Sequence, residues 1–135
     1  MRRLAPSAAA AAALAVALAG CGRNTDPFTV AGTSKCLKDN DFRVSTRAKD
    51  IGFVAQSAPD GALRAFTSGS ANVTISFADD PLGAANQIRA YRKFAPKRLK
   101  RRLRDILFSR RNAVLLWSVA PTTEQLQTAM NCLHP

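Results

Sequence analysis

The stretch ANVTISFADDP at residues 71–81 decides the fold, because it joins a strand directly to the start of a helix. Its apolar residues alternate with small polar ones, and this period of two is typical of a strand with one buried face. The residues of that face are Val73, Ile75 and Phe77. Asp80 and Pro81 then form a helix start, with a capping carboxylate and a proline in the first turn, where its missing N–H costs nothing.

Outward from this stretch, the sequence predicts further strands and helices. Alternation or short apolar runs bounded by turn residues predict strands at 42–46, 51–56, 62–68 and 112–120. Caps and helical spacing predict helices at 34–40, 80–95, 96–111 and 122–133. Gly69 and Ser70 indicate a tight hairpin before the central strand. Thr122 with Gln125 matches a capping box for the last helix.

These elements predict an α+β domain with two layers. We expect a mixed, mostly antiparallel sheet of about five strands, with helices packed on one face. A helix lies between strands 71–78 and 112–119, so this pair can be parallel through a right-handed crossover. The earlier strands are joined by short turns and should be antiparallel.

The beginning of the chain has the pattern of an export signal. MRRLAPS carries two arginines and no acid, and a run of twelve apolar residues follows at 8–19. This run is too short to cross a bilayer as a helix, which takes about 20 residues. It does have the length of the apolar core of a signal peptide.

The next residues, Leu18, Ala19, Gly20 and Cys21, resemble the lipobox of bacterial lipoproteins at all four positions. The resemblance implies a cleaved signal peptide at 1–20 and a diacylglyceryl group on the sulfur of Cys21. Residues 21–33 would then be a lipidated tether, and 34–135 a single domain on the extracytoplasmic face of a bacterial membrane. The alternative is a secreted protein with an unmodified Cys21.

The exported part is also similar to small lipoproteins of high-GC bacteria. The matching features are Cys36 with Leu37, the strand VLLWSVAP at 114–121, and Cys132 with Leu133. These motifs are structural, and the resemblance implies no particular activity.

Cys36 and Cys132 remain as an even pair once Cys21 is assigned to lipid. Because disulfides persist in exported proteins, we predict that these two cysteines are bonded. The alternative is a metal site that adds His134 to the two cysteines. Its ligand spacing differs from that of structural zinc sites, so we predict neither a metal nor another cofactor.

The strongest charge feature is a basic segment at 89–111. The whole chain has a formal net charge of +11, and without residues 1–20 it has 18 basic residues against nine acidic ones, a net charge of +9. The segment holds eleven of these basic residues and one acid, Asp105. Pro96 ends or kinks the preceding helix, and residues 96–111 are then predicted to form a basic amphipathic helix with Leu99, Leu103, Ile106 and Leu107 on its apolar side.

Such a segment predicts contact with a polyanion. Attraction to anionic lipid is worth about 1 kcal/mol per basic residue near the surface. The predicted contact residues are Lys97, Arg98, Lys100, Arg101, Arg102 and Arg104. The partner would be an anionic membrane or a cell-wall polymer, and export disfavours nucleic acid other than extracellular DNA. A solvated helix face without a partner is the alternative.

The sequence shows no motif for a named reaction. It lacks G-x-S-x-G, H-E-x-x-H and a glycine-rich phosphate loop, and its one histidine, His134, is next to the end. We therefore predict no catalytic residues and a non-enzymatic, membrane-anchored binding or accessory module. A small cell-envelope hydrolase, whose residues meet only in the fold, is the alternative.

Overall fold

A computed structural model describes residues 25–135, and in this part of the chain the centre is a five-stranded sheet. The strands are β1 (Arg43–Ser45), β2 (Ala62–Phe66), β3 (Asn72–Phe77), β4 (Leu107–Arg110) and β5 (Ala113–Trp117). Their order across the sheet is β1-β2-β3-β5-β4, and every neighbouring pair is antiparallel. The predicted α+β class, strand number and β2–β3 hairpin are confirmed.

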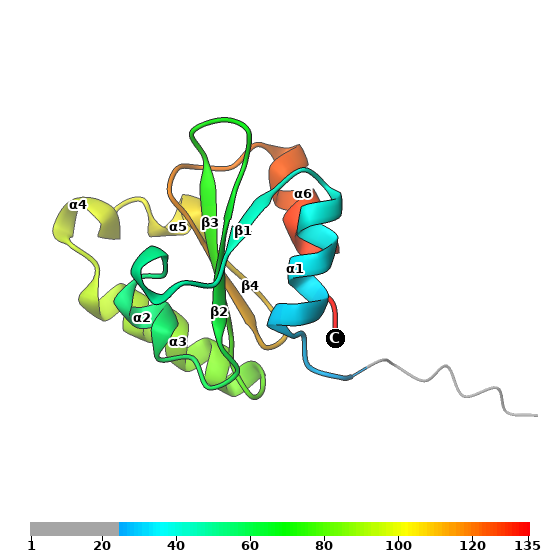
Figure 1. The fold of residues 1–135 in the computed structure, drawn as a ribbon. Coiled ribbons are helices and arrows are strands. Elements are labelled where there is room, and N and C mark those ends of the chain that lie inside the picture. Colours follow the sequence, from blue (N-terminus) through cyan, green and yellow to red (C-terminus); the bar gives the residue numbers. More distant parts are fainter. Residues whose placement is uncertain (1–24) are drawn as a thin grey trace, which may run out of the picture.

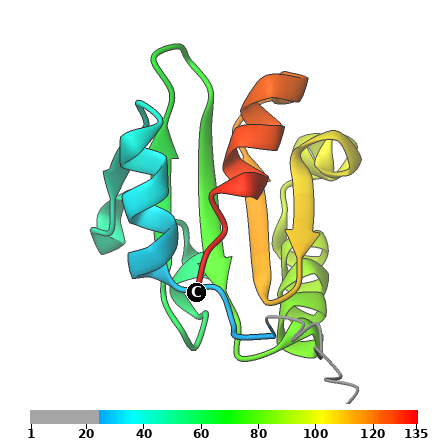
Figure 2. The ribbon, with the colours of Figure 1, turned by 90° about the vertical axis from the view of Figure 1, so that its right-hand side faces the viewer.

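Helices cover both faces of this sheet (Figure 1). α1 (Val30–Asp39) and α6 (Thr123–Asn131) lie side by side on one face, as Figure 2 shows from the front. α2 (Phe53–Gln56) and α3 (Pro81–Phe94) cover the other face, and α4 (Lys97–Lys100) and α5 (Leu103–Ile106) follow on that side in Figure 1. A short 3-10 helix, η1 (Ala48–Asp50), precedes α2.

The prediction of helices on one face is wrong because the polar side of β3 is also buried. Val73, Ile75 and Phe77 are fully buried in the main core, as expected from the alternation. Ser76, on the other side of β3, is fully buried too. Its hydroxyl donates to Oε1 of Gln87 on α3 at 2.6 Å, and Nε2 of Gln87 donates to the Val54 carbonyl at 3.2 Å. The polar side of β3 can therefore be covered by a second helical layer, because Gln87 satisfies the buried Ser76 hydroxyl.

The expected parallel pairing of 71–78 with 112–119 is also wrong. β3 and β5 are antiparallel, with Val73 opposite Trp117 and Phe77 opposite Ala113. The cause is β4, which was expected to be helix. The chain leaves β3, forms α3 to α5, runs back as β4 at the sheet edge and then turns into β5. The extra strand reverses the direction of β5 relative to β3.

Two further predictions need correction. Residues 51–56 were expected as a strand, but they include α2 and follow η1, so their apolar run forms a short helix. The first helix begins at Val30, with Thr29 as its cap, instead of at residue 34. Phe28 is buried in the core, so the packed part of the chain starts inside the predicted tether of 21–33.

Asn112 explains why this early segment is held. Its side-chain Oδ1 accepts from the Phe28 N–H at 2.8 Å, and its Nδ2 donates to the carbonyls of Phe28 and Ala78 at 3.0 and 2.9 Å. Asn112 is 2 % exposed, and these three hydrogen bonds give both the oxygen and the nitrogen of its buried side-chain amide a partner. One side chain therefore joins the start of the domain to the end of β3 and to β5.

The local helix signals are confirmed. Asp80 caps α3 by accepting from the Gly83 N–H at 2.7 Å, and Pro81 is the first residue of that helix. The capping box of α6 is formed, with reciprocal bonds between Thr122 and Gln125 at 3.0 and 3.1 Å.

Candidate anionic-surface site

The predicted contact residues lie on α4, α5 and the two residues between them. We call these six the basic surface: Lys97, Arg98, Lys100, Arg101, Arg102 and Arg104. All six are exposed. Leu103 and Ile106 are buried and Leu99 is half-buried, so the expected separation of apolar and basic sides is present.

The expected end of the first helix before Pro96 is present, but the predicted second helix over 96–111 is not one continuous helix. The backbone is extended at Ala95, directly after α3. Both α4 and α5 are single helical turns, and the backbone becomes extended again at Leu107. Like charges three and four residues apart destabilise a helix. Pairing of 107–110 with β5 satisfies the backbone of the second half as a strand. Charge repulsion in 97–104 and strand pairing of 107–110 together explain why the expected long helix does not form.

The basic surface has little internal neutralisation. Within residues 25–135, its one ion pair joins Arg104 Nε to Asp105 Oδ1 at 3.4 Å, and the Arg104 side chain is 88 % exposed. Such an exposed pair contributes about 1 kcal/mol or less. The surface therefore presents nearly its full positive charge to solvent.

Beside this surface is a cavity of about 590 Å³ between α3, α4, α5 and β4. We call it the basic pocket. Arg92 of α3, Lys100 of α4, Arg104 of α5 and Ser109 of β4 supply its polar lining. Its remaining lining is aliphatic, from Ile88, Leu103 and Leu107, and includes no acidic side chain.

A second, apolar cavity of about 340 Å³ lies between α2 and the α3–α4 junction. We call it the aromatic groove. Phe53 and Phe94 line it, with ring centroids 6.4 Å apart in an edge-to-face arrangement. These rings are 80 % and 59 % exposed, which is unusual for phenylalanine. Lys93 lies against the Phe94 ring at 5.4 Å, so cations and exposed aromatic rings are adjacent.

Tyr91 forms part of the groove lining from α3 and has a perturbed ionisation. Burial raises the pKa of its hydroxyl from 10.0 to about 12, although a hydrogen bond with Ser76 acts in the opposite direction. A phenol with this pKa is neutral at physiological pH. Tyr91 therefore contributes packing and a hydrogen bond to the site.

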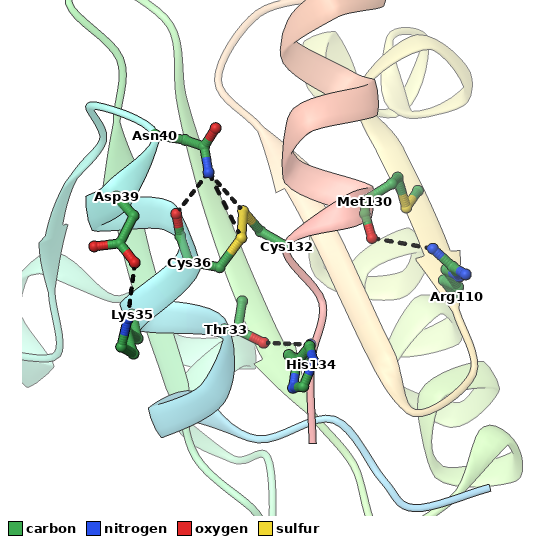
Figure 3. The surroundings of a disulfide bond; sticks show 9 residues. All are labelled: Thr33, Lys35, Cys36, Asp39, Asn40, Arg110, Met130, Cys132 and His134. Atoms are coloured by element: carbon green, nitrogen blue, oxygen red, sulfur yellow. Dashed lines mark hydrogen bonds and ion pairs between the residues drawn. A yellow bond between two sulfur atoms is a disulfide. The ribbon is translucent and has the colours of Figure 1, made fainter. Parts of the chain in front are cut away.

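The predicted disulfide between Cys36 and Cys132 is present, with the two Cα atoms 5.2 Å apart. It joins α1 to the C-terminal cap of α6, and Asn40 Nδ2 lies 3.7 and 3.6 Å from the two sulfur atoms (Figure 3). The metal alternative required both thiols. Bonded cysteines cannot supply thiolate ligands, and no group of three or more metal-binding side chains is assembled anywhere in 25–135.

His134 takes part in the fold through its backbone. Its N–H donates to the Thr33 hydroxyl at 3.3 Å, which ties the end of the chain to α1 (Figure 3). Its imidazole is exposed, and Nδ1 lies 3.4 Å from the carbonyl oxygen of Pro135. Within the described residues, no hydroxyl or thiol is among the hydrogen-bond partners of this ring.

The lipidation residue, Cys21, lies outside the described residues, as do the signal peptide and the first part of the predicted tether. From residue 25 onward, the chain contains no helix with the length and apolar character needed to span a bilayer. Comparison with protein-family models, curated proteins and solved structures found no match for this chain.

Sequence reasoning missed the residues that shape the two cavities. Arg92 and Ser109 were not separated from the rest of the basic segment, because only the crossing of α3 by α4, α5 and β4 brings them together. Phe53 was assigned to a strand. One available signal was Phe94, an aromatic residue directly between Lys93 and the helix-ending Ala95-Pro96.

Proposed function

We propose that this protein is a lipid-anchored accessory module of the bacterial cell envelope, whose basic surface docks on anionic membrane. The observation that carries the proposal is the exposure of the six cations of the basic surface, in which the only ion pair within residues 25–135 is that of Arg104 with Asp105. The lipobox resemblance at Cys21 supplies the anchor. The proposed role is non-enzymatic.

The lipid anchor at Cys21 and the basic surface would act together to hold the domain at the membrane. A single acyl chain gives only marginal membrane binding, whereas a second signal such as further acylation or a basic patch makes the attachment stable. Each basic residue near an anionic surface adds about 1 kcal/mol. Tethering also raises the effective concentration of the basic surface at the bilayer. Electrostatic docking would therefore orient the domain as well as retain it.

The aromatic groove supports a lipid surface over other polyanions. Phe53 and Phe94 are exposed beside Lys93 and α4, and amphipathic surfaces with aromatic and basic residues bind at the interface of a bilayer. A cell-wall polymer would offer the same charges but no apolar layer for these rings. We therefore choose membrane as the surface.

The test uses residues 25–135, which contain the whole sheet, the disulfide and both hydrophobic clusters. This segment is sedimented with vesicles of equal parts phosphatidylglycerol and phosphatidylcholine, and with vesicles of phosphatidylcholine alone. We expect binding to the anionic vesicles only. It should weaken as salt shortens the Debye length from about 30 Å at 0.01 M to about 8 Å at 0.15 M.

Matched variants identify the surface responsible. The surface variant changes Lys97, Arg98 and Arg101 to glutamine, and the control variant changes Lys35, Lys38 and Lys49, which are exposed elsewhere. Both lose three charges. We expect the surface variant to lose at least about tenfold in vesicle affinity and the control less than about threefold. Equal losses, or no binding by the unmodified segment, would refute docking through this surface.

The anchor is tested on the full chain in a bacterial host. Intact mass of the membrane-extracted protein should show cleavage before Cys21 and the added acyl groups. A Cys21→Ser variant should be missing that mass and leave the membrane fraction. An unmodified Cys21 thiol in the membrane-extracted protein would contradict lipid attachment.

A further inference from the structure

The basic pocket has the form of a small-ligand site. Its volume of about 590 Å³ falls within the range of about 300–1,000 Å³ that is usual for ligand cavities. Its polar groups come from four successive elements, α3, α4, α5 and β4, and converge on one concavity. Loops on a flat surface would not produce this convergence. The folding of the basic segment around the end of α3 creates it.

The charges of this pocket are not satisfied within the domain. The side chains of Arg92 and Lys100 form no hydrogen bond or ion pair with other residues in 25–135, and the side-chain partner of Arg104 is its exposed sequence neighbour Asp105. Three cations around one cavity repel each other at close range. An anion bound between them would remove this repulsion.

The number and type of groups favour a phosphate monoester. Such a group carries about −1.5 to −2 charges at pH 7 and three terminal acceptor oxygens. Two guanidinium groups, one ammonium and the Ser109 hydroxyl supply donors for these oxygens, and guanidinium matches phosphate in two-point hydrogen bonding. A carboxylate, with one charge and two oxygens, would leave part of this donor set unused.

The floor of the pocket indicates what is attached to the phosphate. Leu103 is 5 % exposed, and Ile88 and Leu107 are half-buried, so the cavity has an aliphatic base below a cationic rim. Apolar surface stabilises a bound apolar group by about 25 cal/mol for each Å² removed from water. The pocket therefore combines recognition of a phosphate with recognition of adjoining hydrocarbon.

We infer that the basic pocket binds the phosphate monoester group of an amphiphile, with Arg92, Lys100 and Arg104 as phosphate ligands and Ser109 as a hydrogen-bond donor. This inference rests on the proposed function in one respect, since a docked basic surface brings lipid phosphates within reach. It adds a specific ligand group to what is otherwise attraction by charge. A free phosphorylated molecule would be recognised by the same four side chains.

Titration calorimetry on residues 25–135 tests the inference without a bilayer. The probes are dihexanoyl phosphatidic acid below its micelle concentration, dihexanoyl phosphatidylcholine and inorganic phosphate. We expect saturable binding of the phosphatidic acid, weaker binding of inorganic phosphate and none of the phosphatidylcholine. Equal binding of the two lipids would overturn the inference, and so would the absence of binding by the phosphatidic acid. If inorganic phosphate binds as tightly as the phosphatidic acid, the amphiphile is refuted as the ligand.

Two variants with equal charge loss separate the pocket from general attraction. The pocket variant changes Arg92, Lys100 and Arg104 to glutamine, and the surface variant changes Lys97, Arg98 and Arg101, none of which lines the pocket. The first should lose at least about tenfold in affinity for phosphatidic acid and the second less than about threefold. Equal losses would refute a built site.

The two proposals fail in different ways. Vesicle binding that survives while calorimetry shows no phosphate site refutes the pocket alone. If residues 25–135 bind phosphatidic acid in calorimetry but do not bind anionic vesicles, membrane docking is refuted. The ligand of the pocket would then be a soluble phosphorylated molecule.

Discussion

The two faces of the sheet are built by different means. On one face, α1 and α6 pack on the apolar side of the strands and are joined by the Cys36–Cys132 disulfide. On the other face, α3 covers the polar side of β3 through Gln87 and Tyr91, and the chain then forms two single-turn helices. The first face holds the disulfide and most of the larger hydrophobic cluster. The second leaves cations, aromatic rings and two cavities open to solvent.

This difference shows how a small domain can hold an unfavourable charge cluster. Repulsion among the basic residues of α4 and α5 would destabilise a domain that depended on them for its core. The disulfide and most of the larger hydrophobic cluster lie elsewhere, and α4 and α5 contribute to that cluster only through apolar side chains such as Leu103 and Ile106, so their exposed cations are free to serve binding. Changes on the first face should mainly alter the free energy of unfolding, and changes on α4, α5 and the groove should alter binding.

The largest expected effect comes from removing the disulfide. The bridge closes a loop with a sequence separation of 96 residues, for which the loss of unfolded-state entropy corresponds to roughly 4 to 5 kcal/mol. Replacing Cys36 and Cys132 with serine should lower the free energy of unfolding by about 2 to 5 kcal/mol in urea denaturation. Reduced unmodified protein should behave like the variant, and an unchanged unfolding midpoint in both would contradict the assignment of stability to this face.

The next largest expected effect is a pH dependence of the free energy of unfolding, caused by Tyr91. Unfolded tyrosine loses its proton near pH 10, whereas the folded pKa is about 12. The unfolded state therefore binds fewer protons between these values, and the free energy of unfolding should fall by roughly 2 to 3 kcal/mol as pH rises from 10 to 12. Below pH 10 this contribution is fully present.

Tyr91 is the only tyrosine of the chain, so phenolate absorbance reports its titration directly. Tyr91→Phe should lack the extra loss of stability between pH 10 and 12 that unmodified protein shows. A titration midpoint near 10 in the folded protein would indicate that the second face is open to water at this position.

A smaller loss should follow from Gln87→Ala. This change leaves the buried Ser76 hydroxyl without its partner and removes the bond to the Val54 carbonyl, at a cost of about 1 to 2 kcal/mol. Thermal or urea unfolding measures it. Gln127→Ala on the exposed side of α6 is the matched control, and we expect it to change stability by less than about 0.5 kcal/mol. Equal effects would mean that the polar interface under α3 contributes nothing specific.

The smallest expected energy concerns the aromatic groove. Changing Phe53 and Phe94 to serine should weaken binding to anionic vesicles by about fivefold to tenfold, since each ring contributes roughly 1 kcal/mol or less if it only partly enters the interface. Stability should hardly change, because both rings are exposed. Leu82→Ser, at a residue 65 % exposed near the start of α3, is the control for general hydrophobicity. A loss as large in the control would exclude a role for the groove.

The sequence by itself determined the features that depend on near neighbours. The alternation in 71–78, the Asp80 cap and the Thr122–Gln125 capping box are local, since they follow from side-chain period and from hydrogen bonds three residues apart. The exposure of the basic residues also follows locally, because the free energy of burying unpaired charges is prohibitive. The cysteine pair followed from counting.

Only the tertiary structure decided the rest. LFSR at 107–110 has no decisive period, and it became β4 because β5 offered unpaired backbone groups at that edge. Ser76 became buried because Gln87, eleven residues further along the chain, lies where it accepts the hydroxyl hydrogen bond. The basic pocket exists because four elements meet around the end of α3. Each outcome depends on a partner distant in sequence or on a reversal of the backbone. The local residue pattern predicts neither of these.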